Sequence, residues 1–149
     1  MRTGNRRRFA RYAIPFMVLL MTGAACGGGG NNVDATLSNF KIVLGSSSAK
    51  TGDITFKIKN DGPSTHEFVV FKTDLAPDAL PTKVEDGVTI VDEEGAGVEA
   101  IDEKEDIPSG TSTSLTVNLA AGKYVLICNI PDDGGHYKNG MHVGFTVSA

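Results

Sequence analysis

Apolar and polar residues alternate along most of the chain, and this pattern predicts β-strands. Residues 53–59 place Ile54, Phe56 and Ile58 on one face, and residues 111–119 alternate in the same way. Further strands are predicted at residues 33–37, 40–44, 66–72, 124–128 and 140–147. Turn-forming residues separate these segments, and no long helical period follows the N-terminal region. The sequence therefore predicts an all-β fold, a Greek-key β-sandwich.

The middle of the chain departs from this alternation because carboxylates dominate it. Between Glu85 and Asp106 there are ten Asp or Glu residues and a single lysine, Lys104. This composition predicts an irregular acidic excursion from the sandwich, exposed to solvent as a loop or a short helix. The functional alternatives are an acidic docking patch or a weak cation site, although the ordered oxygen-ligand spacing of a calcium loop is missing.

The N-terminal region predicts an export signal, because a basic run precedes an apolar stretch, Ala13 to Leu20, that is too short to span a membrane. The residues Gly23-Ala24-Ala25-Cys26 resemble a bacterial lipobox, whose cysteine is lipidated, although Gly23 stands where leucine is usual. We therefore predict three parts: a signal peptide at 1–25, the lipidated Cys26 with a Gly-rich tether at 26–32, and one domain at 33–149.

The arginines of this region leave two export routes open. The run Arg6-Arg7-Arg8-Phe9-Ala10-Arg11 is similar to a twin-arginine signal, which suits a protein that folds before transport. The alternative is an ordinary secretory signal. Either route predicts an exported protein that is lipid-anchored to the outer face of the cell membrane or periplasmic.

The charge of the mature protein differs from that of the whole chain. Five of the 14 basic residues but none of the 18 acidic residues lie in the predicted signal peptide, so nine positive and 18 negative charges remain, a net charge near −9. An acidic domain does not favour nucleic acid. It suits a protein partner with a basic docking surface, and we expect the domain itself to be a monomer.

The two cysteines indicate unusual chemistry. If Cys26 is lipidated, Cys128 is a lone thiol in an oxidising compartment. Cys128 could be an inert core residue, could pair with Cys26 if lipidation does not occur, or could bind a metal. The stretch that it begins, CNIPDDGGHYKNGM, adds an imidazole and a thioether within a few residues.

Side-chain parity along the predicted strands selects among the candidate ligands. Met141 has the parity of the core-facing residues of the last strand, whereas His142 has the opposite parity and should point to solvent. Cys128 ends the preceding strand, and His136 lies on the loop between them. His66 begins a strand distant in sequence, which the fold must bring close.

The resulting donor set is two imidazoles, a thiolate and a thioether, from His66, His136, Cys128 and Met141. Soft sulfur with imidazole suits copper better than calcium or magnesium, and two His and one Cys with a weaker Met form mononuclear electron-transfer copper sites. A zinc finger would need four strong ligands, commonly in Cys-x-x-Cys pairs, which the sequence lacks.

At these positions the chain resembles the cupredoxins, in particular the plastocyanin, azurin and sulfocyanin-like group of type 1 blue copper proteins. The tail from Tyr124 to Val147, which contains Cys128, His136 and Met141, is similar to the copper-binding end of this family. The turn Asn60-Asp61-Gly62 before His66-Glu67-Phe68 is similar to its first-ligand motif. The resemblance implies a cupredoxin-like sandwich that carries single electrons through one copper ion held by these four ligands.

The loop after Cys128 carries further expectations. Seven residues separate Cys128 from His136, more than in close relatives, so Asp132-Asp133-Gly134 resembles an insertion that leaves potential, geometry and partner fit open. Glu67 and Asn129 each directly follow a ligand, and we expect them, or backbone groups beside them, to tie the two ligand segments together. We expect His136 to be the electron port, on a loop whose Ile130, Pro131, Tyr137 and Gly140 could form a small apolar rim, although Tyr137 could equally be a packing residue.

Three other functions remain to be weighed. A copper storage, delivery or sensing module could use the same ligands. A multicopper oxidase or nitrite reductase needs further histidine ligands, and only His142 is unassigned, so we do not expect an enzyme. An interaction domain that has lost its metal is disfavoured because all four ligand types are present.

Overall fold

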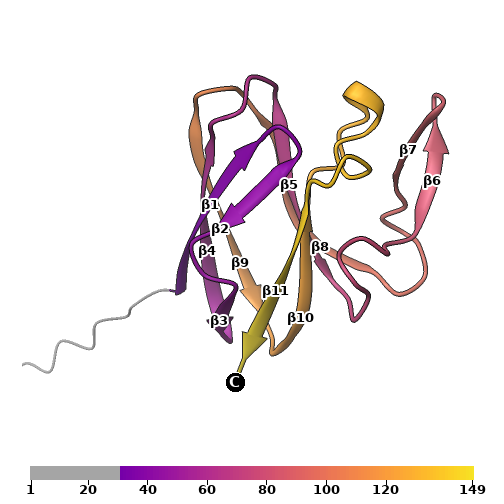
Figure 1. Ribbon diagram of the computed structural model, residues 1–149. Helices are drawn as coiled ribbons and strands as arrows, with labels where there is room; N and C mark the ends of the chain where they lie inside the picture. The colour runs from indigo at the N-terminus through magenta and orange to yellow at the C-terminus, as the bar shows by residue number, and fades with distance from the viewer. Residues whose placement is uncertain (1–30) are drawn as a thin grey trace, which may run out of the picture.

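The computed structural model of the protein describes residues 31–149, which form two packed β-sheets and a separate hairpin (Figure 1). The elements are β1 (Asn31–Ser38), β2 (Lys41–Leu44), β3 (Ser48–Lys50), β4 (Gly52–Asn60), β5 (His66–Lys72), β6 (Thr82–Glu85), β7 (Val88–Val91), β8 (Glu99–Ile107), β9 (Ser112–Leu119), β10 (Gly122–Ile127), the 3-10 turn η1 (Asp132–Gly134) and β11 (His142–Ser148). The predicted signal peptide at 1–25 and Cys26 lie outside the described residues. Within residues 31–149, no helix is long and apolar enough to cross a membrane.

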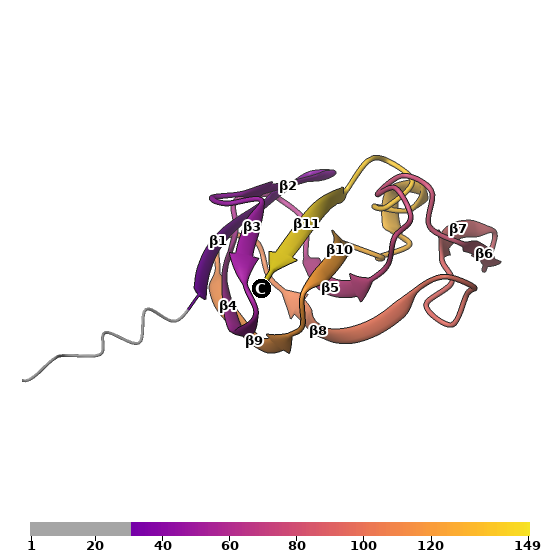
Figure 2. The ribbon, with the colours of Figure 1, turned by 90° about the horizontal axis from the view of Figure 1, so that it is seen from below.

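The two sheets form the layers of a sandwich. One sheet has the strand order β2-β1-β4-β9 and the other has the order β3-β11-β10-β5-β8. Figure 2 shows β1, β4 and β9 in one layer and β11, β10, β5 and β8 in the other. Both sheets are mixed, because β1 pairs in parallel with β4 and β3 pairs in parallel with β11. This architecture confirms the predicted all-β sandwich.

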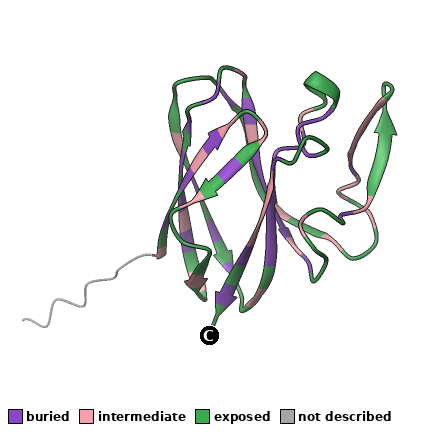
Figure 3. Ribbon diagram, viewed as in Figure 1, coloured by how far each residue is buried: buried purple, intermediate pink, exposed green. Residues whose placement is uncertain are grey.

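The core between the sheets consists of the apolar residues that the alternation assigned to the inner faces. Ile54, Phe56 and Ile58 of β4 are buried (Figure 3). The Phe56 ring packs against Phe68 of the opposite sheet and against Phe145 of β11, with ring centroids 5.2 and 5.3 Å apart. Burial of such apolar area contributes roughly 1.5–3 kcal/mol per side chain, so this face is the main source of stability beneath the site.

The first described strand includes two residues that the sequence pattern assigned to the tether. Asn31 pairs with Ile54 in the β1–β4 ladder, and its side-chain Nδ2 donates to Lys50 O at 2.7 Å. Asn31 and Asn32 therefore belong to the first strand and not to the 26–32 tether. Polar residues can extend a strand because the ladder uses backbone groups, which hydropathy does not reveal.

The acidic middle is more regular than the irregular excursion that its composition predicted. The hairpin of β6 and β7 stands beside the sandwich, and β8 pairs antiparallel with β5 as the edge of the five-stranded sheet. The carboxylates of β8 are exposed, so neither alternation nor helical periodicity marks the strand in the sequence. Charged edge strands of this kind discourage pairing with other chains.

The chain between β5 and β8, together with Tyr137 of the ligand loop, also covers the outer face of the second sheet. Val69, Phe71, Val125 and Ile127 point away from the main core, and a second buried cluster covers them. Its covering members are Leu80, Val91 and Tyr137, with Val98 partly buried beside them. Strands β5 and β10 are thus buried on both faces, which fixes the strands that carry His66 and lead to Cys128.

Candidate metal centre

The turn before His66 is held together by the buried side chain of Asn60. Its Oδ1 accepts from Gly62 N at 2.9 Å, and its Nδ2 donates to Ser64 O and Ile107 O, both at 2.8 Å. A Cβ at Gly62 would lie 2.9 Å from His66 Nε2, so a side chain there would displace the imidazole. The Asn-x-Gly turn before His66 therefore sets the position of this ring.

Backbone hydrogen bonds close the loop that carries the other ligands. Cys128 N donates to Met141 O at 3.1 Å, His136 N donates to Ile130 O at 2.8 Å, and Met141 N donates to His136 O at 3.1 Å. The insertion folds into η1, where Asp133 and Gly134 have φ angles of 53° and 86°. The three extra residues are thus taken up by a tight turn, and His136 still reaches Cys128.

Three buried donor atoms meet at one point. Cys128 Sγ lies 3.2 Å from His136 Nδ1 and 3.8 Å from His66 Nδ1, and the two Nδ1 atoms are 3.1 Å apart. His66 comes from β5, and the other two come from the loop between β10 and β11. Within the described chain, neither His66 Nε2 nor His136 Nε2 has a hydrogen-bond partner. Both rings therefore direct the Nδ1 edge inward, where a metal ion could bind.

Met141 lies on the core face as side-chain parity predicted, whereas His142 lies on the opposite face but is half-buried and not open to solvent. Met141 is fully buried in the same core cluster as Cys128, on the inner face of the second sheet. His142 is half-buried on the other side, where its ring lies 5.2 Å from that of Tyr137. The four candidate ligands are thus brought to one end of the sandwich, and the third histidine is kept away from them.

Burial controls the protonation of the donors. Desolvation, followed by repulsion from His136, lowers the pKa of His66 to about 4. Desolvation also lowers the pKa of His136, against the opposing effect of Asp133 and Asp132. The same cause raises the pKa of the Cys128 thiol to about 12, although the backbone N–H of Glu67 points at the sulfur from 3.4 Å. Metal-free protein at neutral pH therefore holds neutral imidazoles and a protonated thiol.

Glu67 connects the His66 strand to the Cys128 loop. Its Oε1 accepts from Asn129 N at 2.6 Å, and its backbone N–H donates to the Cys128 sulfur. One residue thus contacts both Cys128 and the residue that follows it. Burial raises the pKa of Glu67 to about 7, the Asn129 N–H opposes this, and Glu103 and Glu93 add to the rise. These contacts are of the kind expected for a residue that ties the two ligand segments together.

Replacing Glu67 by glutamine should change how the stability of the metal-free protein depends on pH. The pKa of Glu67 is raised from 4.5 to about 7. Its contribution to the free energy of unfolding is therefore full below pH 4.5 and is lost as pH rises through 7. The contribution of His66, whose pKa is lowered from 6.5 to about 4, is full above pH 6.5 and is lost as pH falls through 4. Between pH 4.5 and 6.5 the two slopes therefore oppose each other.

In Glu67→Gln only the histidine slope remains, so the free energy of unfolding should fall more steeply toward acid, by up to about 1 kcal/mol per pH unit. Urea unfolding of both proteins at several pH values between 4.5 and 7.5 measures this. Glutamine keeps an oxygen that can accept from Asn129 N. Parallel pH profiles for the two proteins would show that this carboxyl group does not titrate as described.

The side chain of Asn129 binds a segment that the sequence did not connect to the site. Asn129 Oδ1 accepts from Val91 N at 2.7 Å, and its Nδ2 donates to Val91 O at 3.1 Å and to Glu93 Oε1 at 3.0 Å. The amide thus pairs with the β7 backbone in the manner of a neighbouring strand. The backbone N–H of Asn129 reaches Glu67, whereas its side chain fixes the hairpin.

Tyr137 is a buried packing residue, which agrees with the second of its two expected roles and excludes it from an exposed rim. Its hydroxyl accepts from Leu80 N and donates to Pro77 O, both at 3.0 Å, so it fastens the start of the excursion to the ligand loop. Phe40 lies instead against His136, with ring centroids 5.2 Å apart. Sequence patterns missed both contacts because they join segments far apart in the chain. The one local sign of the Phe40–His136 contact was that Phe40 follows a turn-forming asparagine, Asn39.

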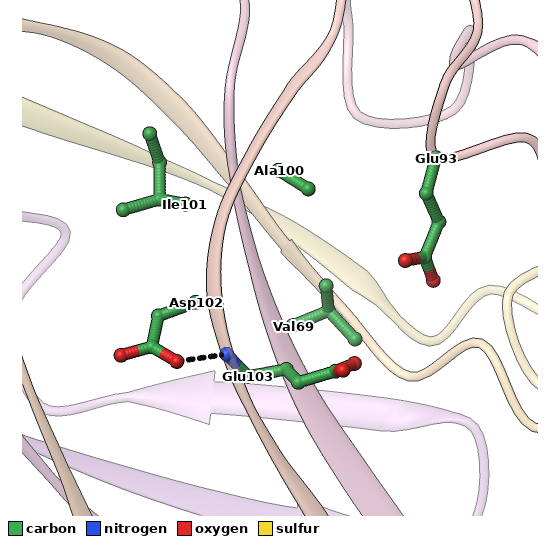
Figure 4. A pocket seen from close by; sticks show the side chains of 6 residues that line it. All are labelled: Val69, Glu93, Ala100, Ile101, Asp102 and Glu103. Atoms are coloured by element: carbon green, nitrogen blue, oxygen red, sulfur yellow. Dashed lines mark hydrogen bonds between the residues drawn. The ribbon is translucent and has the colours of Figure 1, made fainter.

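A surface pocket of about 220 Å³ lies between β8 and the segment after β7. Figure 4 shows Glu93 and Glu103 facing this space from opposite sides, with Val69, Ala100, Ile101 and Asp102 around them. Desolvation raises the pKa of Glu103, and repulsion from Glu93 adds to the rise. The pocket is therefore a concentration of negative charge, separate from the three buried donors but joined to them through the Glu93–Asn129 hydrogen bond.

Comparison with protein families matches the sulfocyanin (SoxE) domain to residues 19–149 of the chain. No curated protein sequence matches it.

Several solved structures share the fold. The dithionite-reduced auracyanin of the photosynthetic bacterium Roseiflexus castenholzii has a TM-score of 0.54 at 20% identity, over 82% of this chain and 100% of that one. Rusticyanin from Thiobacillus ferrooxidans has a TM-score of 0.53 at 16% identity, over 80% and 79%. Auracyanin A, a "blue" copper protein from Chloroflexus aurantiacus, has a TM-score of 0.50 at 18% identity, over 79% and 100%. At these identities the likeness shows the fold.

Proposed function

The chain belongs to the sulfocyanin (SoxE) family of blue copper proteins with the cupredoxin fold, and from this premise we propose that it shuttles single electrons between redox proteins outside the cytoplasm. The observation that carries the proposal is the cluster of His66, Cys128 and His136, whose ligand atoms all lie within 4.8 Å of one another in the buried end of the sandwich. The donor chemistry fits copper, with Met141 as the fourth, weaker ligand. A bound copper ion supplies a one-electron couple between Cu(II) and Cu(I).

The chain's own residues prepare the site for this task. The donors come from a β-strand and from a loop closed by backbone hydrogen bonds, so their positions are set before a metal binds. The N–H of Glu67 points at the Cys128 sulfur and stabilises negative charge there. Because the Cys128 thiol is protonated in the metal-free protein, metal binding must release its proton. Glu67 and Asn129 hold the surrounding segments in place.

Burial of the donors favours an electron carrier over copper delivery. His66 and Cys128 are fully buried and His136 is 1% exposed, so an acceptor protein could not reach the ligands without opening the loop. An electron, by contrast, can pass through a few ångströms of packed side chains. The remaining histidine, His142, stacks on Tyr137 away from the cluster, which leaves no second set of imidazoles for oxidase chemistry.

The partner and the location extend this proposal. We propose export, lipid anchoring through Cys26, and a redox partner with a basic docking surface. The basic docking surface of the partner is supported by the charge near −9 of the mature chain and by the carboxylates that line β8 and the pocket of Figure 4. Association should then weaken as ionic strength rises, because exposed charges are screened within about 8 Å at physiological salt.

Cyclic voltammetry of the copper-loaded protein tests the function. An electron carrier should give a reversible one-electron wave that persists over many cycles, because neither oxidation state loses the ion. The same cycles in the presence of a copper(I) chelator extend the test. A wave that decays as copper passes to the chelator would contradict the carrier role and favour delivery.

A further inference from the structure

The turn between β1 and β2 contains a bulky residue in an unfavourable backbone conformation. Ser38 pairs with Lys41, so Asn39 and Phe40 form a two-residue hairpin loop. Phe40 has a φ of 58°, in the left-handed region where hairpin loops usually place glycine or asparagine. Such a conformation is unfavourable for a residue with a side chain, because its Cβ crowds the backbone. The aromatic ring must therefore do something that a glycine at this position would not.

The Phe40 ring covers the edge of the metal site that His136 forms. The two rings meet edge to face, with centroids 5.2 Å apart and an interplanar angle of 72°. Phe40 is half-buried and packs on the main core, whereas His136 is 1% exposed and its Nε2 is buried. Edge-to-face contact of this kind is favourable beyond the burial of apolar area, so it offsets part of the backbone strain.

The two ligand turns leave room for this hairpin. A Cβ at Gly62, before His66, would lie 3.1 Å from Asn39 Oδ1. A Cβ at Gly140, beside Met141, would lie 3.8 Å from Phe40 O. The hairpin thus lies between the first-ligand turn and the second-ligand loop, with a glycine on each side. The hairpin therefore packs closely against the first-ligand turn at Gly62 and lies in ordinary contact range of Gly140.

We propose that Phe40 is a shielding residue, which closes the His136 edge of the site to water and small ligands and presents its own ring as the surface that a redox partner meets. The second part of this statement, that a redox partner meets the Phe40 ring, rests on the function proposed above. The first part concerns the protein fold alone and holds with or without metal. Because His136 is only 1% exposed, the proposal places Phe40 between the expected electron port, His136, and the partner.

Chemical modification of the metal-free protein tests the shield without relying on copper. Diethyl pyrocarbonate acylates neutral, accessible imidazole nitrogens, and mass spectrometry of peptides gives a rate for each histidine. The rate at His136 should be low in the unmodified sequence and at least tenfold higher in Phe40→Gly, with His142 unchanged as the internal reference. Glycine suits the turn backbone, and Phe40→Asn, which also tolerates positive φ, is the second variant. Val43→Ala, at an exposed position of the same hairpin, is the matched control and should leave the rate unchanged.

Azide titration of the copper-loaded protein tests the same claim at the metal. The unmodified protein should keep its visible spectrum, and Phe40→Gly should bind azide at least tenfold more tightly. Unchanged His136 modification and unchanged azide binding in both folded Phe40 variants would overturn the proposal. Failure of the protein to take up copper would refute the proposed function instead, and the modification rates would still decide whether Phe40 shields His136.

Discussion

A Cys128→Ser variant should lose the intense visible absorption of the copper-loaded protein and should bind copper at least about 100-fold more weakly. Changes to groups that only support a metal ligand already cost 10–100-fold in affinity, so loss of a direct ligand should cost more. The intense colour comes from copper–thiolate bonding, which a serine oxygen cannot provide. The sulfur also lies 3.2 Å from His136 Nδ1, inside the cluster of donors. Visible spectra and a competitive copper titration measure the two effects.

The control for this variant is His142→Ala. His142 is close in sequence to the ligand loop, two residues after Gly140. It lies on the other face of the sheet, however, against Tyr137. Its removal should leave the colour and the copper affinity unchanged. A Cys128→Ser protein that retains the absorption, or a His142→Ala protein that loses it, would show that the ligands are assigned wrongly.

An Asn129→Ala variant should lose about 2–4 kcal/mol of unfolding free energy. The Asn129 side chain makes two hydrogen bonds with the Val91 backbone and one with Glu93. Val91 is fully buried, so its N–H would have no partner after the substitution, and a buried unsatisfied group costs about 1–3 kcal/mol. Because the same amide fixes the hairpin beside the ligand loop, the reduction potential should also shift. Urea unfolding and voltammetry measure the two quantities.

Asn118→Ala is the matched control for the asparagine. Its Nδ2 donates to Asp53 Oδ1 at 2.7 Å on the exposed face of the other sheet. Loss of this bond leaves no buried group unpaired, so stability should change by less than about 0.5 kcal/mol. Equal losses in the two variants would mean that the Val91 pairing contributes nothing special. A potential unchanged in Asn129→Ala would remove this residue from a role at the metal.

The sequence predicted the sandwich because its inner faces alternate. The periodicity of Ile54, Phe56 and Ile58 reports burial directly, and those residues line the core. Strand β8 was missed because almost all of its side chains are exposed. Its place is decided by the free backbone edge of β5, which no property of residues 99–107 reveals.

The candidate ligands were predictable because few soft donors occur in this acidic chain and their parity matches one end of the sandwich. The supporting contacts were harder to predict. Glu67 and Asn129 stand next to ligands and were expected to matter, but the pairing of Asn129 with Val91 depends on how the hairpin folds back. Phe40 was expected to begin a strand, and only its backbone angle and its contact with His136 show that it belongs to the site.

Titration of the purified protein with Cu(II), followed by visible absorption and electron spin resonance, tests the central claim most directly. One equivalent should produce an intense blue colour and the narrow hyperfine splitting of copper bound to a thiolate, saturating at one ion per chain. A colourless protein, or copper with only the spectrum of nitrogen and oxygen ligands, would contradict the account, because His66, Cys128 and His136 would then not share one ion.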